Sequence, residues 1–191
     1  SQDVLPDDRS LSILPWGHLM GQTVEVHLLI YCGISAALMG NISNLAPDLP
    51  VVRPTILFAV PRVFTRIYDG VEQSIRARSG FADWLYERTI RRAVRRKTPE
   101  PAGVGQRLLD ALAERLILKG IRERLGGRLR FVVSGAAALS PEVIRFFDLL
   151  GVSIYEGYGL TETTMAVCSN AKGARRIGSV GRPLSCARIT L

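Results

Sequence analysis

Two short apolar runs, each followed by small residues and separated by one helix, constrain the fold of this chain more than any other feature. Residues 131–139 read FVVSGAAAL, and residues 152–159 read VSIYEGYG. Between them, Ser140 and Pro141 suit an N-cap and a first helical position, and Gly151 suits the end of a helix. This order predicts a βαβ unit, in which the carboxyl ends of both strands meet at one edge of a parallel sheet.

The rest of the chain alternates in the same way. Short apolar runs predict buried strands at residues 11–15, 34–39 and 55–60. Helices are predicted at residues 17–32, 61–79, 81–97 and 104–125. The second of these helices carries one apolar stripe, which we assign to the core: Val63, Ile67, Val71 and Ile75. The fold class is therefore α/β, with a mostly parallel sheet flanked by helices.

Composition excludes several classes of protein. The 191 residues are 47% hydrophobic and 22% charged, which favours a packed globular core over disorder. No apolar run reaches the roughly 18–20 residues that span a bilayer. The three cysteines are far apart and form no CxxC pair, so we expect neither a zinc site nor a disulfide framework. We expect a cytoplasmic protein, in contact at most with the periphery of a membrane.

The positive charge is concentrated in one helical segment. The net charge is +8, and residues 62–130 hold 17 Lys and Arg against 8 Asp and Glu. Within them, one side of a predicted helix carries Arg91, Arg92, Arg95 and Arg96. A solvated face is the simplest interpretation, and contact with anionic lipid is the alternative. Nucleic acid is not expected as a partner, because the nearby aromatic residues do not interleave with the charges.

Residues 155–164, YEGYGLTETT, carry the strongest chemical signal. The glycines let backbone N–H groups approach a phosphate, and Tyr158 between them offers a face on which a base can stack. Thr161 can bond a phosphate oxygen, and Glu162 supplies a carboxylate of the kind that holds Mg²⁺. We expect residues 156–163 to form a Gly-rich polar turn, and a purely structural turn explains them equally well.

The small residues that follow the other strand support the same site. Ser134 and Gly135, followed by three alanines, leave room for a flat ligand at the carboxyl end of a strand, where open α/β sheets bind ligands. Close packing of strand against helix is the simpler explanation of this segment alone. The two segments side by side are a more specific signal than either one.

Taken with their surroundings, these motifs resemble a known family. SGAAALS, then a helix, IYEGYGLTET and GSVGRPL resemble the AMP-forming adenylate superfamily of acyl-CoA synthetases, adenylation domains and luciferases. LPWGHLMGQTVE and RPTILFAVPRVFTRIYDGV are similar to the long-chain fatty acyl-CoA synthetases in particular. The resemblance covers nearly the whole chain, from about Asp7 to Leu191. It implies that a fatty acid carboxylate attacks the α-phosphate of ATP, with Mg²⁺, and that the thiol of coenzyme A then displaces AMP.

The resemblance also assigns roles to individual residues. It places seven residues in the nucleotide site, around the adenine: Gly135, Ala136, Ala137, Glu156, Gly157, Tyr158 and Gly159. Thr161 would bind the α-phosphate, and Glu162 would coordinate Mg²⁺. His18 matches a position near the reacting carboxylate, although a packed structural histidine beside Trp16 is an equally good interpretation.

Parts that the family's reaction needs are not found within residues 1–191, so we expect a partial AMP-binding domain. The Ser/Thr/Gly-rich loop with its Lys, which holds the β- and γ-phosphates, would lie upstream. The Asp that holds the ribose, and the small C-terminal domain, would lie downstream. We therefore expect these 191 residues alone to have no ligase activity.

Two alternatives stay open. The first is a fatty acyl-AMP ligase or an adenylation domain that hands the acyl group to a carrier protein. The second is a non-catalytic basic module that binds a nucleotide or a membrane. Glu162 separates this module from an enzyme, because a pure binder has little need of a metal-binding carboxylate beside a phosphate-binding threonine.

Overall fold

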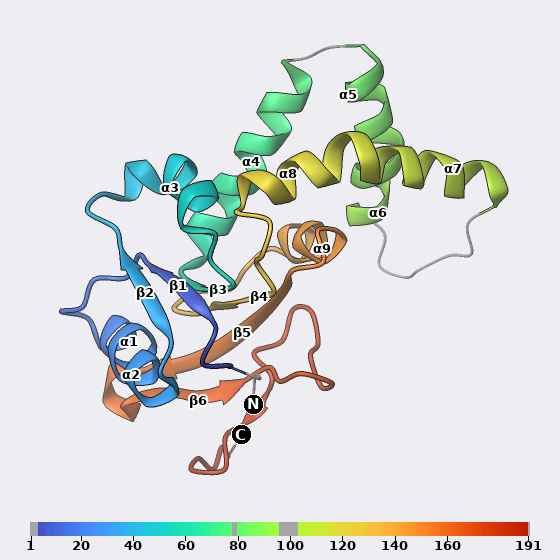
Figure 1. Ribbon diagram of the computed structural model, residues 1–191. Helices are drawn as coiled ribbons and strands as arrows, with labels where there is room; N and C mark the ends of the chain where they lie inside the picture. Colours follow the sequence, from blue (N-terminus) through green and yellow to red (C-terminus); the bar gives the residue numbers. More distant parts are fainter. Residues whose placement is uncertain (1–3, 78–79, 96–102, 191) are drawn as a thin grey trace.

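The structure is a computed structural model that describes residues 4–77, 80–95 and 103–190. Within these residues, seven strands form a sheet in the order β2-β1-β3-β4-β5-β6-β7 (Figure 1). Their bounds are β1 (Arg9–Ser12), β2 (Ser35–Leu38), β3 (Ile56–Ala59), β4 (Phe131–Ser134), β5 (Ser153–Leu160), β6 (Met165–Ser169) and β7 (Arg182–Pro183). The first five strands are parallel, whereas β6 and β7 are antiparallel to their neighbours. The predicted α/β class and mostly parallel sheet are confirmed.

Helices cover both faces of the sheet. One face is covered by a continuous helix made of α1 (Leu19–Gly21), the π-helical turn η1 (Gln22–His27) and α2 (Leu28–Cys32). The other helical segments are η2 (Ile42–Asn44), α3 (Leu45–Val52), α4 (Pro61–Arg76), α5 (Phe81–Tyr86), η3 (Glu87–Arg91), α6 (Arg92–Arg95), α7 (Val104–Ala113), η4 (Glu114–Leu118), α8 (Lys119–Arg124), α9 (Pro141–Leu149) and η5 (Thr161–Thr163). Among the described helices, none is long and apolar enough to cross a bilayer.

Alternation along the central strands divides the core between the two faces. Phe58 and Phe131 face α1–α2, where they pack with buried Val24 and Leu29. The intervening strand residues point to the opposite face, against α3, α4 and α9, where Phe64 and Phe147 pack edge to face with ring centroids 5.7 Å apart. The stripe on α4 belongs to this second core, as predicted: Val63 and Ile75 are buried, and Ile67 and Val71 pack against it.

Two long helices form an arm that projects beyond the sheet (Figure 1). α5, η3 and α6 run as one helix, and α7, η4 and α8 run as the other; we call residues 81–95 and 104–124 the helical arm. A buried core that includes Leu85, Ile90 and Ile117 holds the two helices together. Glu72 of α4 fastens the arm, because its Oε1 accepts a hydrogen bond from the Tyr86 hydroxyl at 3.5 Å and lies 3.7 Å from Nε of Arg91. The hydroxyl of Tyr68, on α4 itself, donates to the same oxygen at 2.9 Å. Burial and the hydrogen bond to Glu72 raise the pKa of Tyr68 to about 12.

The segment 156–163 differs from its prediction as a turn. β5 continues through Glu156 and both glycines to Leu160 and pairs with β6, with an irregular register between Tyr158 and Gly159. The glycines serve close strand pairing rather than a turn: a Cβ added at Gly159 would lie 1.8 Å from the carbonyl oxygen of Met165. The turn is confined to η5 and closes at Thr164, which has a left-handed φ of 56°.

Helix α3 is not among the predicted helices. Its sequence, LAPDLPVV, contains two prolines, which sequence reasoning treats as helix breakers. Pro47 lies in the first turn, where a backbone N–H has no partner inside the helix in any case. Leu45 and Leu49 of this helix are buried in the core, so packing stabilises it despite Pro50 in its interior.

Candidate functional site

The carboxyl ends of β4 and β5 lie side by side, as the βαβ unit predicts. The two strands are parallel neighbours, with Ser134 opposite Glu156. A Cβ added at Gly135 would lie 3.8 Å from the carbonyl oxygen of Gly157 and 3.2 Å from Cε of Met20 on α1. The structure thus brings together the small residues after β4, the second half of β5 and the start of α1.

The loop after β4 holds three alanines at the surface. Ala136 has a φ of 72°, in the left-handed region that few residues other than glycine adopt. Ala136, Ala137 and Ala138 are exposed, and Leu139 returns the chain to the core. Left-handed backbone at a non-glycine residue costs of order 1–3 kcal/mol, and such residues cluster at active sites and ligand-binding segments. The loop therefore exposes backbone and methyl groups to solvent.

Glu156 fixes this loop from the neighbouring strand. Its side chain is 5% exposed, and its Oε1 accepts a hydrogen bond from the backbone N–H of Leu139 at 3.1 Å. The carboxylate is thus bonded within the protein, on the strand that pairs with β4. Its predicted contact with a nucleotide stays a prediction, and its observed contact sets the position of the alanine loop.

Tyr158 and the turn after β5 present their polar groups to solvent. Tyr158 is 46% exposed on β5, and Thr161 and Glu162 are exposed in η5. Within the described residues, the Thr161 hydroxyl and the Glu162 carboxylate have no hydrogen-bond or ion-pair partner. An aromatic face, a hydroxyl and a carboxylate are therefore available together at one end of β5.

Thr163 shapes this turn, a role that the motif analysis missed. Its Oγ1 accepts a hydrogen bond from the backbone N–H of Leu160 at 3.0 Å and lies 3.0 Å from the carbonyl oxygens of Leu160 and Met165. The side chain thus joins the end of β5 to the start of β6. Thr163 follows Leu160 by three residues, which is the typical spacing of a capping contact. This spacing is a signal in the sequence that could have predicted the role of Thr163.

The donor set is compatible with magnesium bound together with phosphate. Among the described residues, no group of three or more His, Cys, Asp or Glu side chains could hold a metal ion on its own. Mg²⁺ commonly binds through one or two carboxylates plus substrate phosphates and waters. Glu162, exposed and without an internal partner, fits that arrangement.

His18 is the N-cap residue of α1, two residues before Met20. Its side chain is exposed, and its Nδ1 accepts a hydrogen bond from the backbone N–H of Met20 at 3.2 Å. Met20 in turn lies against Gly135. The structure therefore brings His18 to the same region as the β4 and β5 ends, and its role near a carboxylate stays a prediction.

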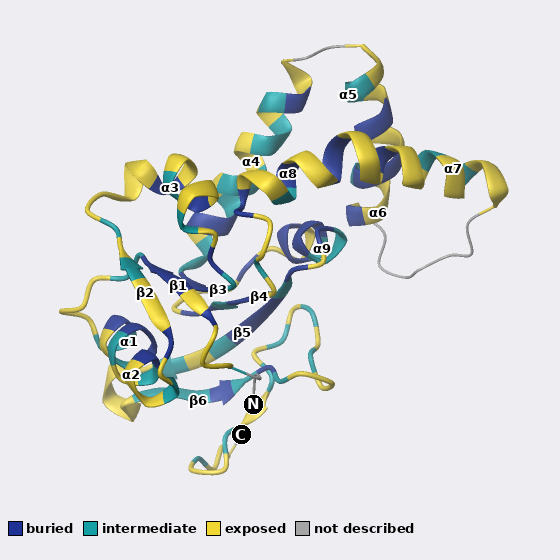
Figure 2. Ribbon diagram, viewed as in Figure 1, coloured by how far each residue is buried: buried dark blue, intermediate teal, exposed yellow. Residues whose placement is uncertain are grey.

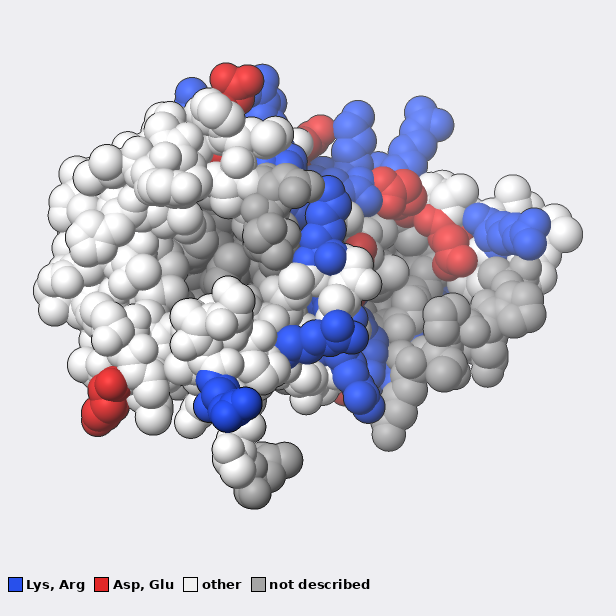
Figure 3. All heavy atoms as spheres, turned by 90° about the horizontal axis from the view of Figure 1, so that it is seen from below, with Lys and Arg blue, Asp and Glu red and all other residues white. Residues whose placement is uncertain are grey.

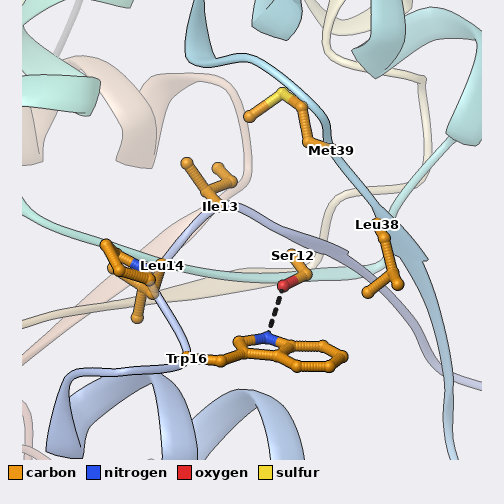
Figure 4. A pocket seen from close by; sticks show the side chains of 7 residues that line it. Ser12, Ile13, Leu14, Trp16, Leu38 and Met39 are labelled. Atoms are coloured by element: carbon orange, nitrogen blue, oxygen red, sulfur yellow. Dashed lines mark hydrogen bonds between the residues drawn. The ribbon is translucent and has the colours of Figure 1, made fainter.

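A buried glutamate fixes the loop that leads to His18, and no motif pointed to it. Glu25 of η1 is 1% exposed; its Oε2 accepts a hydrogen bond from the Ser12 hydroxyl at 2.5 Å, and its Oε1 accepts the backbone N–H of Ile13 at 2.9 Å. The indole N–H of Trp16 donates to Ser12 Oγ at 3.0 Å (Figure 4). Ser12 and Trp16 line a cavity of about 310 Å³ whose other walls come from Ile13, Leu14, Pro15, Leu38 and Met39.

Comparison with known proteins gives one consistent result. A family model described as AMP-binding enzyme matches residues 1–191. Long chain acyl-CoA synthetase 7, peroxisomal, from Arabidopsis thaliana is 32% identical over 191 residues, which cover 99% of this chain and 26% of that protein. Long-chain-fatty-acid–CoA ligase 1 from Homo sapiens is 35% identical over 188 residues, which cover 97% of this chain and 26% of that protein. The chain thus spans about a quarter of the length of these curated relatives.

Solved structures give the same fold. A benzoate CoA ligase from Burkholderia xenovorans LB400 matches 95% of this chain and 28% of its own, with a TM-score of 0.60 and 21% identity. A long-chain-fatty-acid-CoA ligase (FadD1) from Archaeoglobus fulgidus matches 94% of this chain and 29% of its own, with a TM-score of 0.58 and 16% identity. The family resemblance and the fold class predicted from the sequence are both confirmed.

Proposed function

Because the chain belongs to the AMP-binding enzyme family, we propose that residues 1–191 form part of the AMP-binding domain of a long-chain fatty acid–CoA ligase. The observation that carries this proposal is the meeting of the β4 and β5 ends, where Tyr158, Thr161 and Glu162 are exposed beside the alanine loop. The substrates are a fatty acid, ATP and coenzyme A.

The slot between the alanine loop and β5 binds the adenine. Backbone and methyl groups at Gly135, Ala136 and Ala137 form one wall, and Gly157 and Tyr158 form the other. Stacking on Tyr158 contributes about 1–3 kcal/mol and needs no base-specific hydrogen bonds. Gly159 and Glu156 shape the slot indirectly. Gly159 has no side chain and so lets β6 approach β5, and Glu156 fixes the alanine loop through its hydrogen bond to Leu139.

The two steps follow from the chemistry of the substrates. A carboxylate oxygen of the fatty acid attacks the α-phosphorus of ATP, a P–O bond forms, and pyrophosphate leaves with the electron pair of the broken P–O bond. The thiol of coenzyme A then gives its proton to solvent and its sulfur attacks the acyl carbonyl carbon; a C–S bond forms, and AMP leaves with the electron pair of the broken C–O bond. Catalysis of this kind depends on positioning and on neutralising charge.

Residues of the turn after β5 act on the phosphate. Thr161 holds the α-phosphate through its hydroxyl, and Glu162 holds Mg²⁺. When bound, the metal supplies positive charge that offsets the charge of the phosphate oxygens. His18, at the start of α1, orients the fatty acid carboxylate. The loop that carries His18 is fastened by Glu25.

Two alternatives to a CoA ligase are an enzyme with a different acyl acceptor and a module without catalytic activity. The observations disfavour the second. A fatty acyl-AMP ligase, or an adenylation domain that serves a carrier protein, would use the same slot for its first step. A non-catalytic nucleotide- or membrane-binding module would have little use for an exposed carboxylate with no internal partner beside Thr161. The relatives named as CoA ligases favour coenzyme A as the acceptor.

We propose a cytoplasmic protein with peripheral membrane contact. Of the arginines considered for this contact, Arg92 and Arg95 are exposed on α6. The guanidinium of Arg91 is held by Glu72 and Glu87, which makes it a structural residue of the arm. Arg96 lies outside the described residues.

The test is adenylate formation by the full-length ligase, measured as fatty acid-dependent exchange of pyrophosphate into ATP. Loss of a metal-binding carboxylate removes several kcal/mol of charge stabilisation, so Glu162→Ala should lower exchange by about 100-fold or more. Glu123→Ala, an exposed glutamate on α8, is the matched control and should exchange like wild type. Exchange at the wild-type rate by Glu162→Ala would overturn the proposed site.

A further inference from the structure

One side of the arm's second helix is apolar and exposed. Val104, Leu108, Leu112 and Leu116 recur every four residues along α7 and η4, and their exposed fractions are 77%, 67%, 36% and 55%. Residues spaced in this way lie on one face of a helix. Exposed apolar residues are ordinary when scattered singly, but a contiguous stripe of this kind marks a contact surface.

The apolar stripe continues onto the arm's first helix. Phe81 and Trp84 are 57% and 50% exposed on α5, and their rings stack with centroids 5.7 Å apart. Phe81 and Leu116 line the same shallow cavity of about 110 Å³, so the aromatic pair and the leucine stripe adjoin. We call the following six residues the apolar arm face: Phe81, Trp84, Val104, Leu108, Leu112 and Leu116. Exposed segments of α5 and α7 are visible in Figure 2.

Cations with no internal partner lie on the same two helices as this face. Within the described residues, six exposed basic side chains of the arm have no hydrogen-bond or ion-pair partner: Arg88, Arg92, Arg95, Arg107, Arg115 and Lys119. Three of the arm's acidic groups are bonded internally, since Glu87 pairs with Arg91, Glu114 pairs with Arg122, and Asp110 accepts from Gln106. In Figure 3, most of the visible Lys and Arg side chains lie from the centre to the right of the view, with some Asp and Glu side chains among them. The six cations outnumber the arm's two other acidic residues, Asp83 and Glu123, so the arm presents an excess of positive charge beside an apolar surface.

We propose that the apolar arm face docks on the surface of an anionic lipid bilayer. Leucines and stacked aromatic rings enter the boundary between headgroups and acyl chains, while arginine and lysine extend to the phosphates. A second copy of this chain is a poorer occupant, because it would bring like charges together. The inference deepens the proposed function and rests on it, since a ligase for fatty acids would meet its substrate at such a surface.

Flotation of the full-length protein with vesicles tests the docking. Wild type should float with phosphatidylcholine vesicles that contain phosphatidylglycerol, and much less with phosphatidylcholine alone. Arg92→Ser combined with Arg95→Ser should weaken binding about 30-fold, from roughly 1 kcal/mol per arginine. Leu108→Ser combined with Leu112→Ser should weaken it about tenfold or more, from the lost apolar burial. Ile30→Ser combined with Tyr31→Ser, two exposed apolar residues on α2 outside the arm, is the matched control and should bind like wild type.

Three readouts separate docking from folding and from catalysis. Unfolding midpoints of all variants should match wild type, because the changed side chains are exposed. Arg92→Lys combined with Arg95→Lys should restore binding, since the charge is kept. Pyrophosphate exchange with a short, water-soluble fatty acid should be unchanged in the arm variants, so failed docking and failed catalysis are distinguishable. Equal flotation of wild type and the leucine variant, or a change of oligomeric state in that variant, would overturn the proposal.

Discussion

The backbone N–H of Leu139 donates to Oε1 of Glu156 at 3.1 Å, which joins the loop after β4 to the neighbouring strand β5. Both residues are buried, whereas Ala136, Ala137 and Ala138 between β4 and Leu139 are exposed. The alanine loop is thus held at its far end by a single side chain from the other wall of the proposed slot. The separation of the two walls depends on this contact.

Replacing Glu156 should therefore affect both stability and nucleotide binding. Glu156→Ala leaves the buried Leu139 N–H without an acceptor, at a cost of about 1–3 kcal/mol in the free energy of unfolding. Glu156→Gln keeps an acceptor oxygen and should lose less. Urea unfolding and the KM for ATP of the full-length protein measure the two effects. An alanine variant as stable as the glutamine variant would contradict the role given to this hydrogen bond.

Gly159 should tolerate substitution far less well than Gly157, although both lie in β5. A Cβ at Gly159 would lie 1.8 Å from the carbonyl oxygen of Met165, so Gly159→Ala must displace β6. A Cβ at Gly157 would lie 3.4 Å from the carbonyl oxygen of Cys168, which is an ordinary contact. We expect Gly159→Ala to destabilise the protein by about 1–3 kcal/mol, as overpacking does, and Gly157→Ala to cost much less. Thermal unfolding of the two variants compares them; equal midpoints would contradict this geometry.

Loss of the Glu25 carboxylate should loosen the loop between β1 and α1. Glu25→Ala leaves the backbone N–H groups of Ile13 and Leu14 without their acceptor. Each group that is shielded from water then costs about 1–3 kcal/mol in the free energy of unfolding. Hydrogen exchange at these two amides should then become at least about tenfold faster. Glu25→Gln keeps one acceptor oxygen and should protect them better. Unchanged exchange in the alanine variant would show that Glu25 does not hold the loop.

Asp8 should make the fold sensitive to acid. It precedes β1, accepts hydrogen bonds from the Thr55 hydroxyl at 2.6 Å and from the Leu5 N–H at 2.8 Å, and pairs with Arg130. Burial alone would raise the pKa of Asp8, but the hydrogen bonds and Arg130 together lower it below its usual value of 3.8.

Because the folded-state pKa is lowered, this carboxylate stabilises the fold above its unfolded pKa, and the stabilisation is lost as the pH falls through the folded value. Urea midpoints of wild type should therefore decline below pH 3.8 more steeply than those of Asp8→Asn. Parallel declines in the two proteins would contradict the contribution of Asp8.

Local sequence signals were sufficient for the framework of the site. The βαβ unit around β4, α9 and β5 was predicted because apolar runs, an N-cap at Ser140 and a terminal Gly151 are encoded within a few residues of each other. The helix α3 was missed because its stability comes from buried Leu45 and Leu49, which outweigh the effect of Pro50. Packing of this kind leaves little trace in local propensity.

The contacts that fix the site were harder to predict. Gly159 was interpreted as part of a turn, because the sequence does not show that β6 returns against it. Glu25 reaches Ser12 across thirteen residues, from a helix to the end of a strand, and a single buried carboxylate has no motif. Tyr158, Thr161 and Glu162 were singled out by their chemistry within a Gly-rich segment, but only the resemblance to a known family assigned each of them a role.

Photolabelling of the full-length protein with an azido-adenine analogue of ATP, in the presence of Mg²⁺, tests the proposed slot most directly. Mass spectrometry of the labelled peptides should locate the adduct at residues 135–138 or 156–158, and unmodified ATP should compete for it. Tyr158→Ala should reduce labelling about fivefold or more, from the loss of roughly 1–3 kcal/mol of stacking. Labelling that ATP competes away, but that maps outside both segments and is unaffected by Tyr158→Ala, would contradict the proposed adenylate site.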